Sequence, residues 1–322
     1  MRYASFALAI AGAVVAAQPV LAQEWPSEPI RMIVGYPAGG TTDVIARALS
    51  EQLSTQLGAP VLVENRAGAG GIVGASEVVG APADGYTFLI AASPEIAIAP
   101  ATGREMPFNP REDLKPVSLV CEISTMLVAN SSVPADTVDE LKALAKEQPG
   151  KLNYASFGTG TSNHLTGELF KAETGLDIAH IPFKGGAPAM TDLLGGRVQL
   201  MFESVSAVQK HVEAGTLKAL GFASDERSAL MPDVPTLDEA GVPGFVVGSW
   251  VGVLAPAGTP SEITERMSKE VAAAVQSPKL AELLAGRGLQ CPGSTSEEFA
   301  QFIDKEITKW SEVAERAGIE AE

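Results

Sequence analysis

Apolar residues along the first third of the chain fall alternately into short continuous runs and into helical spacing. Residues 30–34, IRMIV, form a mostly apolar run of strand length, and apolar residues then recur every four positions across 45–57, where a glycine follows. This spacing places them on one face of a helix that the glycine ends. Residues 60–64 and 86–91 predict two further strands, with a second helix opening at 67–75. The region therefore consists of β-α-β units, whose strands are parallel.

The same alternation returns in the second half of the chain. Four strands are predicted there, at Leu152–Ser156, Ile178–Phe183, Val198–Phe202 and Leu217–Ala223. Serine or threonine followed three residues later by glutamate marks helix starts. Such pairs occur at Thr137 with Glu140, at Thr259 with Glu262, and at Thr295 with Glu298. After residue 254 we expect helices rather than further strands.

Two longer apolar stretches, Val117–Ala129 and Phe245–Leu254, separate the two α/β series. They are typical of extended segments that cross between two lobes. We therefore predict an α/β fold of two lobes, each a mostly parallel sheet flanked by helices, with two extended hinge crossings. Domain 1 would comprise residues 23–120 and 248–322, and domain 2 residues 121–247.

The amino-terminal segment is predicted to be a signal peptide. Arg2 precedes the apolar run Ala4–Ala17, and the small residues before Gln23 fit cleavage after Ala22. The run has 14 residues, whereas a helix that spans a bilayer needs about 20. We therefore expect export of the chain and no membrane anchor.

Charge and composition exclude several classes of protein. The formal net charge is −16 and aromatic residues make up 6%, so a nucleic-acid partner is not expected. Three widely spaced histidines, His164, His180 and His211, do not predict a metal site. Cys121 and Cys291 are compatible with a disulfide in an oxidising compartment, and equally with two buried thiols.

Two glycine-rich turns between a strand and a helix are the best candidates for binding. Tyr36–Thr42 and Ser156–Ser162 each combine glycines with hydroxyl side chains at a helix start. Free backbone N–H groups and the helix dipole bind anions there without any lysine or arginine. With one turn in each predicted lobe, we expect the two to hold a carboxylate between them. His164 lies in the first turn of the second helix.

Other motifs give weaker or negative signals. The run of glycines from Gly68 to Gly74 does not fit the dinucleotide fingerprint, and we interpret it as a close approach of helix and strand. The hydrolase, zinc-protease and P-loop signatures G-x-S-x-G, H-E-x-x-H and G-x-x-x-x-G-K-[ST] are absent. An enzyme is therefore not expected. Glu95 and Glu203, each just after a predicted strand, would either face the cleft or be solvated strand ends.

Several longer motifs resemble a known family. They are IRMIVGYPAGGTTDVIAR, VLVENRAGAGGIVGASEV, ADGYT, PGKLNYASFGTGTSNHLTGELF, IPFKGGAPAMTDLLGGRVQLMF and WVGVLAPAGTP. In this order they resemble the substrate-binding receptors of tripartite tricarboxylate transporters, the Bug family. The resemblance covers essentially the whole chain after the predicted signal peptide.

The resemblance implies a periplasmic, monomeric solute-binding protein with a Venus-flytrap, type II-like fold and no cofactor. It would capture a dicarboxylate, an acidic amino acid or an aromatic acid and deliver it to membrane permease subunits. The alternatives are a ligand-sensing receptor for a signalling system and an exported α/β hydrolase. In the family, backbone N–H groups and ordered waters of two loops bind the ligand, which here are Pro37–Thr42 and Gly158–Ser162. The segments around Glu95 and Glu203 are where ligand identity varies.

Residue patterns and resemblance together predict the ligand-binding residues. They are Tyr36, Pro37, Ala38, Gly39, Gly40, Thr41, Thr42, Ser93, Ser156, Gly158, Thr159, Gly160, Thr161, Ser162, His164, Phe183 and Glu203, followed by Glu95, Lys184 and Gly185.

Overall fold

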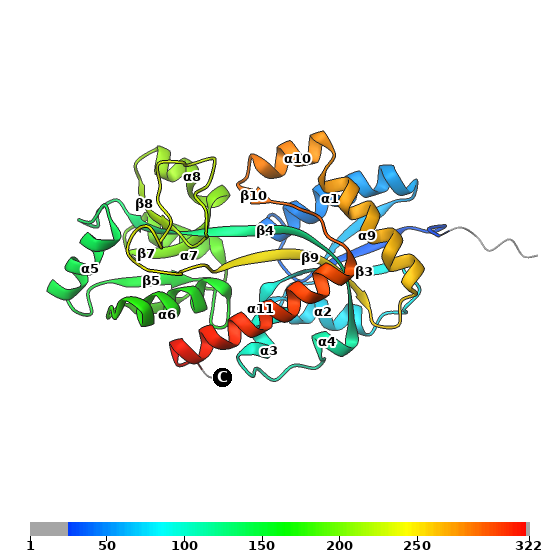
Figure 1. Cartoon of the computed structure of the whole chain (residues 1–322), viewed down its shortest axis with the longest axis horizontal. Coiled ribbons are helices and arrows are strands. Elements are labelled where there is room, and N and C mark those ends of the chain that lie inside the picture. Colours follow the sequence, from blue (N-terminus) through cyan, green and yellow to red (C-terminus); the bar gives the residue numbers. More distant parts are fainter. Residues whose placement is uncertain (1–24, 320–322) are drawn as a thin grey trace, which may run out of the picture.

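The structure is a computed structural model that describes residues 25–319. The predicted signal peptide, residues 1–22, lies outside the described residues. The molecule is elongated, with one α/β lobe at each end and two long strands running between them (Figure 1). The strands follow one another in the order β2-β1-β3-β9-β4-β7-β5-β6, with β8 and β10 also paired to β4.

The first lobe contains the amino-terminal β-α units and the carboxy-terminal helices. Strand β1 (Ile30–Val34) lies parallel to both β2 (Val61–Asn65) and β3 (Thr87–Ala92), as the sequence predicted. The other elements are α1 (Thr41–Leu57), η1 (Ala69–Gly71), α2 (Ile72–Val79), η2 (Pro94–Ile98), α3 (Ala99–Ala101), α4 (Pro110–Asp113), α9 (Ser261–Val275), α10 (Pro278–Ala285), β10 (Leu289–Gln290) and α11 (Ser296–Ala317).

The second lobe repeats the arrangement around β5 (Asn153–Ser156). This strand is parallel to β6 (Ala179–Pro182) and to β7 (Leu200–Ser204). The remaining elements are α5 (Val138–Glu147), α6 (Ser162–Thr174), α7 (Gly186–Leu194), α8 (Val205–Glu213) and β8 (Leu217–Phe222). Buried apolar side chains of β7, β8, α7 and α8 form one core cluster of this lobe, among them Met201, Phe222, Leu193 and Val208.

Two antiparallel strands connect the lobes, as the two long apolar stretches predicted. Strand β4 (Leu114–Asn130) pairs with β9 (Gly248–Pro256) from Leu114 to Ser124 and with β7 and β8 from Thr125 onward. The change of partner at Ser124–Thr125 marks the crossing. The predicted domain boundaries at residues 120 and 248 lie close to it and stay predictions.

Helix α11 packs along the crossing and reaches both lobes (Figure 1). Glu306 accepts hydrogen bonds from the buried indoles of Trp250 in β9 and Trp310 in α11, at 3.1 and 3.2 Å. Near its end, Arg316 pairs with Glu173 of α6 in the second lobe. The helix therefore ties the crossing strands to both lobes.

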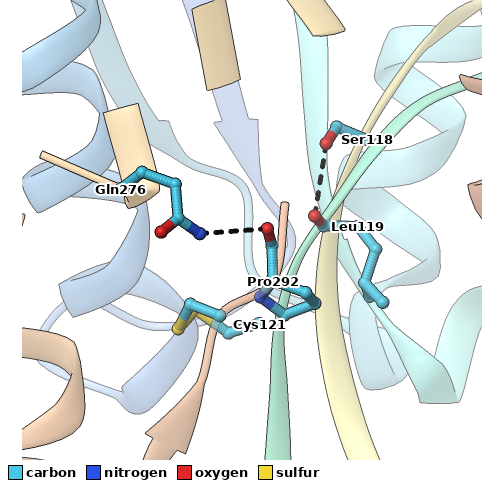
Figure 2. The surroundings of a disulfide bond; sticks show 6 residues. Ser118, Leu119, Cys121, Gln276 and Pro292 are labelled. Atoms are coloured by element: carbon cyan, nitrogen blue, oxygen red, sulfur yellow. Dashed lines mark hydrogen bonds between the residues drawn. A yellow bond between two sulfur atoms is a disulfide. The ribbon is translucent and has the colours of Figure 1, made fainter. Parts of the chain in front are cut away.

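A disulfide joins Cys121 of β4 to Cys291, which follows β10. Figure 2 shows the neighbouring hydrogen bond from Gln276 Nε2 to the carbonyl of Pro292, 3.2 Å long. The sequence separation is 170, so in the chain-entropy account the bond stabilises the fold by about 5 kcal/mol.

The helix starts and the carboxy-terminal third bring two confirmations and two corrections. Thr295 and Glu298 form the predicted capping box. Thr137 caps α5 by accepting from the Glu140 N–H, although the Glu140 side chain accepts from the Asp136 N–H and not from that of Thr137. Thr259 does not cap α9, because the Pro260 carbonyl accepts the first helical hydrogen bonds and moves the helix start to Ser261. The expectation of helices alone after residue 254 is also wrong, since the two-residue strand β10 pairs with β4.

Candidate functional site

The turn between β5 and α6 is held by its own polar groups. Ser156 Oγ lies 3.1 Å from the donating Gly158 N–H, and Thr161 Oγ1 donates to the Gly158 carbonyl at 2.7 Å. Gly158 and Gly160 have φ of +132° and +77°, which favours glycine at both positions. Thr161 is the extended N-cap of α6 and makes no side-chain cap. The Thr161 side chain therefore does not satisfy the first N–H groups of α6.

Two histidines of the second lobe hold this turn in place. Gly160 N–H donates to His164 Nδ1 at 3.2 Å, and His164 stacks on His180 with ring centroids 4.1 Å apart. Burial, together with neighbouring His164, lowers the pKa of His180 to about 4. His180 is therefore neutral near pH 7 and adds no charge to the turn. Helix α6 has no acidic residue in its first turn.

The turn between β1 and α1 also contains a glycine with positive φ, but an acidic side chain accepts its N–H. Gly39 has φ of +85°, and its N–H donates to Asp43 Oδ2 at 2.9 Å. Asp43 also accepts from Asn65 at 2.8 Å and from Arg47 at 3.0 Å. Burial raises the pKa of Asp43, but these hydrogen bonds outweigh it and the pKa is lowered. An ionised carboxylate of the protein thus lies at this helix start.

A cavity of about 210 Å³ lies between the two lobes. The second lobe contributes residues 157–161 of the β5–α6 turn, so four predicted residues, Gly158, Thr159, Gly160 and Thr161, line it. The first lobe contributes Ala69, Gly70, Pro94 and Arg104. Residues 36–42 of the β1–α1 turn do not line it. Tyr36 contacts a lining residue, since its Oη lies 3.2 Å from the Gly70 carbonyl.

Glu95 is fully buried inside the first lobe. Its carboxylate accepts from the Ala92 N–H at 2.9 Å and from Tyr36 Oη at 2.5 Å. Burial raises the pKa of Glu95 to about 7 despite these bonds, and burial together with Glu95 raises the pKa of Tyr36. The structure thus gives Glu95 partners within its own lobe. The hydroxyl of neighbouring Ser93 is likewise bonded inside the protein, 2.8 Å from that of Ser249 in β9.

The remaining predicted residues belong to the second lobe and lie outside the cavity lining. Glu203 is buried and accepts from the N–H and hydroxyl of Ser204 at 2.7 and 3.0 Å; burial raises its pKa to about 7. Phe183 packs against the core of the lobe. Lys184 is exposed, and Gly185 is the N-cap of α7.

The glycine run after β2 mainly allows close packing, as predicted. A Cβ on Gly35 would lie 2.7 Å from Gly71 Cα, and one on Gly74 would lie 2.7 Å from Gly35 Cα. A Cβ on Gly71 would lie 2.5 Å from the Glu95 carboxyl carbon. These glycines bring α2, the end of β1 and Glu95 together. Gly70 of the same run also reaches the cavity, which the sequence pattern alone did not reveal.

Arg104 is the charged one among the cavity residues of the first lobe, Ala69, Gly70, Pro94 and Arg104, none of which the sequence predicted as ligand-binding. It follows α3 in an irregular segment, and its N–H donates to the Ala99 carbonyl at 3.0 Å. No periodicity or motif marked it; the available signal was a basic residue in a chain whose predicted binding turns contain none.

Within residues 25–319, the structure shows no cluster of three or more histidine, cysteine, aspartate or glutamate residues able to hold a metal ion. Over the same range, no helix is both long and apolar enough to span a bilayer.

Comparisons with known proteins assign the chain to a family. The family profile described as "Tripartite tricarboxylate transporter family receptor" matches residues 45–319. "Protein BugT" of Bordetella pertussis is 40% identical over 316 residues, covering 97% of each chain.

Solved structures agree with this assignment. The Rhodopseudomonas palustris protein Rpa4515, solved with adipate, has a TM-score of 0.88 at 35% identity, covering 93% of this chain and 100% of that one. MatC of the same organism, solved with bound malate, has a TM-score of 0.82 at 30% identity, covering 90% and 99%. The periplasmic binding protein BugD gives 0.84 at 33%, covering 92% and 100%. The chain therefore belongs to the tripartite tricarboxylate transporter receptor family, the family of the Bug periplasmic binding proteins.

Proposed function

We propose that this protein captures a small carboxylate in the cavity between its lobes and delivers it to the membrane subunits of a tripartite tricarboxylate transporter. The observation that carries this is the start of α6 at the cavity wall. Helix N–H groups and a dipole unopposed by any acid of the first helical turn are available there. Adipate and malate in two similar proteins support an acid as ligand.

The acid is held chiefly by the β5–α6 turn. Its carboxylate accepts hydrogen bonds from the first N–H groups of α6, while Gly158 and Gly160 let the ligand approach the backbone. The β1–α1 turn and Tyr36 form the edge of the site in the first lobe and contribute less, because Asp43 already occupies that helix start.

Binding involves no bond-making step. The two lobes close on the acid by bending at the crossing of β4 and β9, near the change of partner at Ser124–Thr125. A closed, liganded form is then presented to the permease after export of the chain and removal of its first 22 residues.

Thermal unfolding with a panel of short dicarboxylates, acidic amino acids and aromatic acids tests the proposal. A ligand that binds only the folded state raises the melting temperature by mass action. We expect such a rise for at least one acid, with no acid consumed when the mixture is analysed by NMR. No rise with any acid, together with turnover of an ester or amide, would support a hydrolase instead.

A further inference from the structure

The side chain of Arg104 lies between the two glycine loops that face each other across the cavity. A Cβ built on Gly70 in the first lobe would lie 3.9 Å from Arg104 Nη1, and one built on Gly160 in the second lobe would lie at the same distance. Both loops present glycine at this point, so no side chain separates the guanidinium from the space between the lobes.

This guanidinium has no acidic partner within the part of the chain that the structure describes. Arg104 is also the one charged residue among the nine that line the cavity. By contrast, most arginines of residues 25–319 pair with a carboxylate. They are Arg31, Arg47, Arg66, Arg111, Arg197, Arg227 and Arg316. A partly buried cation that faces a cavity without a counterion is suited to an external anion.

The cavity thus offers two anion-binding groups of different kind, from opposite lobes. The start of α6 supplies N–H groups from the second lobe, and Arg104 supplies a full charge and a fork of donors from the first. The volume of about 210 Å³ equals that of about seven waters in the liquid. That space is larger than one carboxylate group and suits a short chain with an acid at each end.

We propose that Arg104 binds the second acid group of the ligand and makes the site selective for dicarboxylates over monocarboxylates of equal length. This inference rests on the proposed function, because it takes for granted that the first acid group binds at the start of α6. The first lobe offers that second group no other charged partner among the cavity-lining residues.

Calorimetric titration of Arg104→Gln with matched diacids and monoacids tests the inference. The probes are succinate with butanoate and adipate with hexanoate. We expect the variant to lose about tenfold or more in affinity for the better diacid, while its affinity for the matching monoacid stays within about threefold of the wild type. Arg287→Gln is the control, since it removes the same charge from an exposed arginine outside the cavity, and it should leave both affinities unchanged.

The outcomes separate this inference from the proposed function. Diacid affinity unchanged in Arg104→Gln, or diacid and monoacid affinities reduced equally, would overturn the role of Arg104 while acid binding by the wild type stands. Failure of the wild type to bind any acid would remove the proposed function itself. Equal melting temperatures of wild type and variant without ligand would show that the loss is not caused by unfolding.

Discussion

The two glycine-rich turns share a backbone plan but differ in the side chain that supports them. In each, a glycine with positive φ donates its N–H to a residue four positions later, which is the third residue of the following helix: Gly39 to Asp43, and Gly160 to His164. The first partner is an ionised carboxylate and the second is an imidazole nitrogen. A similar sequence pattern therefore produces one helix start that already has an anion and one that is open to a ligand.

The buried groups that contact the turns also differ. Glu95 is hydrogen-bonded to Tyr36 of the first turn, whereas the stacked pair His164 and His180 contacts the second turn through Gly160. Only the second turn lines the cavity between the lobes. We propose from this comparison that glycines and hydroxyls identify where a ligand could bind, while the charge of one buried neighbour decides which turn is available.

The largest expected effect concerns pH and Glu95. Its pKa of about 7 in the folded state exceeds the value of about 4.3 in an unfolded chain. The folded state therefore binds more protons between these values, and stability falls as pH rises through that window. Through this group the free energy of unfolding of the wild type should fall by about 3 kcal/mol between pH 4.5 and 8. We expect Glu95→Gln to lack this decrease, as measured by urea unfolding at several pH values.

Glu203→Gln is the matching substitution in the second lobe, because burial also raises the pKa of Glu203 to about 7. It should remove a similar share of the pH dependence from the second lobe. A difference between Glu95→Gln and wild type that is the same at every pH would show that Glu95 does not titrate in this range.

The next largest effects are expected on the free energy of unfolding, when the residue that supports each turn is substituted. Asp43→Asn places an amide NH₂ among three donors, from Gly39, Asn65 and Arg47, and should cost about 2 kcal/mol. His164→Asn keeps an acceptor for Gly160 and should cost about 1 kcal/mol. Unfolding in urea measures both. Equal costs would mean that the charge of Asp43 does not hold the first turn.

A proline substitution at the first position of each helix distinguishes the two turns most clearly when ligand affinity is measured. Ser162→Pro removes one N–H at the start of α6, yet proline is favoured at this position and Thr161 is already extended. We expect about a tenfold loss of acid affinity. Thr41→Pro makes the same change in α1, after extended Gly40, and should lower affinity by about threefold or less. Equal losses in calorimetry would mean that both turns hold the acid.

The smallest effect is expected when a carboxylate like that of Asp43 is introduced at the matching position of the second turn. His164→Asp introduces a carboxylate at the third residue of α6 and should weaken acid binding by about 1 kcal/mol. His164→Asn has nearly the same shape without the charge and serves as the control. If both variants bind the acid equally in titrations at pH 7.5, the difference in charge between the turns has no influence on binding.

Periodicity and local motifs were sufficient for most of the fold. Apolar runs predicted the parallel strands and the two crossings, because burial of a strand requires continuous apolar residues. The glycines of the β5–α6 turn were found because their positive φ restricts the residue type. These signals are local, so they can be recognised without knowing the tertiary structure.

The missed features depend on residues that are distant in sequence. Arg104 lies in an irregular segment, and its place opposite Gly160 depends on how the two lobes face each other. The environment of Glu95 depends on contact with Tyr36 and Gly71. The sequence alone gives Asp43 only the favourable position of any acid in the first turn of a helix. Its bonds to Gly39 and to the more distant Asn65 show that it occupies the turn.

A crystal structure with a short dicarboxylate bound is the most direct measurement. We predict one carboxylate within hydrogen-bonding distance of the first N–H groups of α6 and the other against the guanidinium of Arg104. A ligand outside this cavity, or one whose acid groups are held by the β1–α1 turn alone, would contradict that prediction.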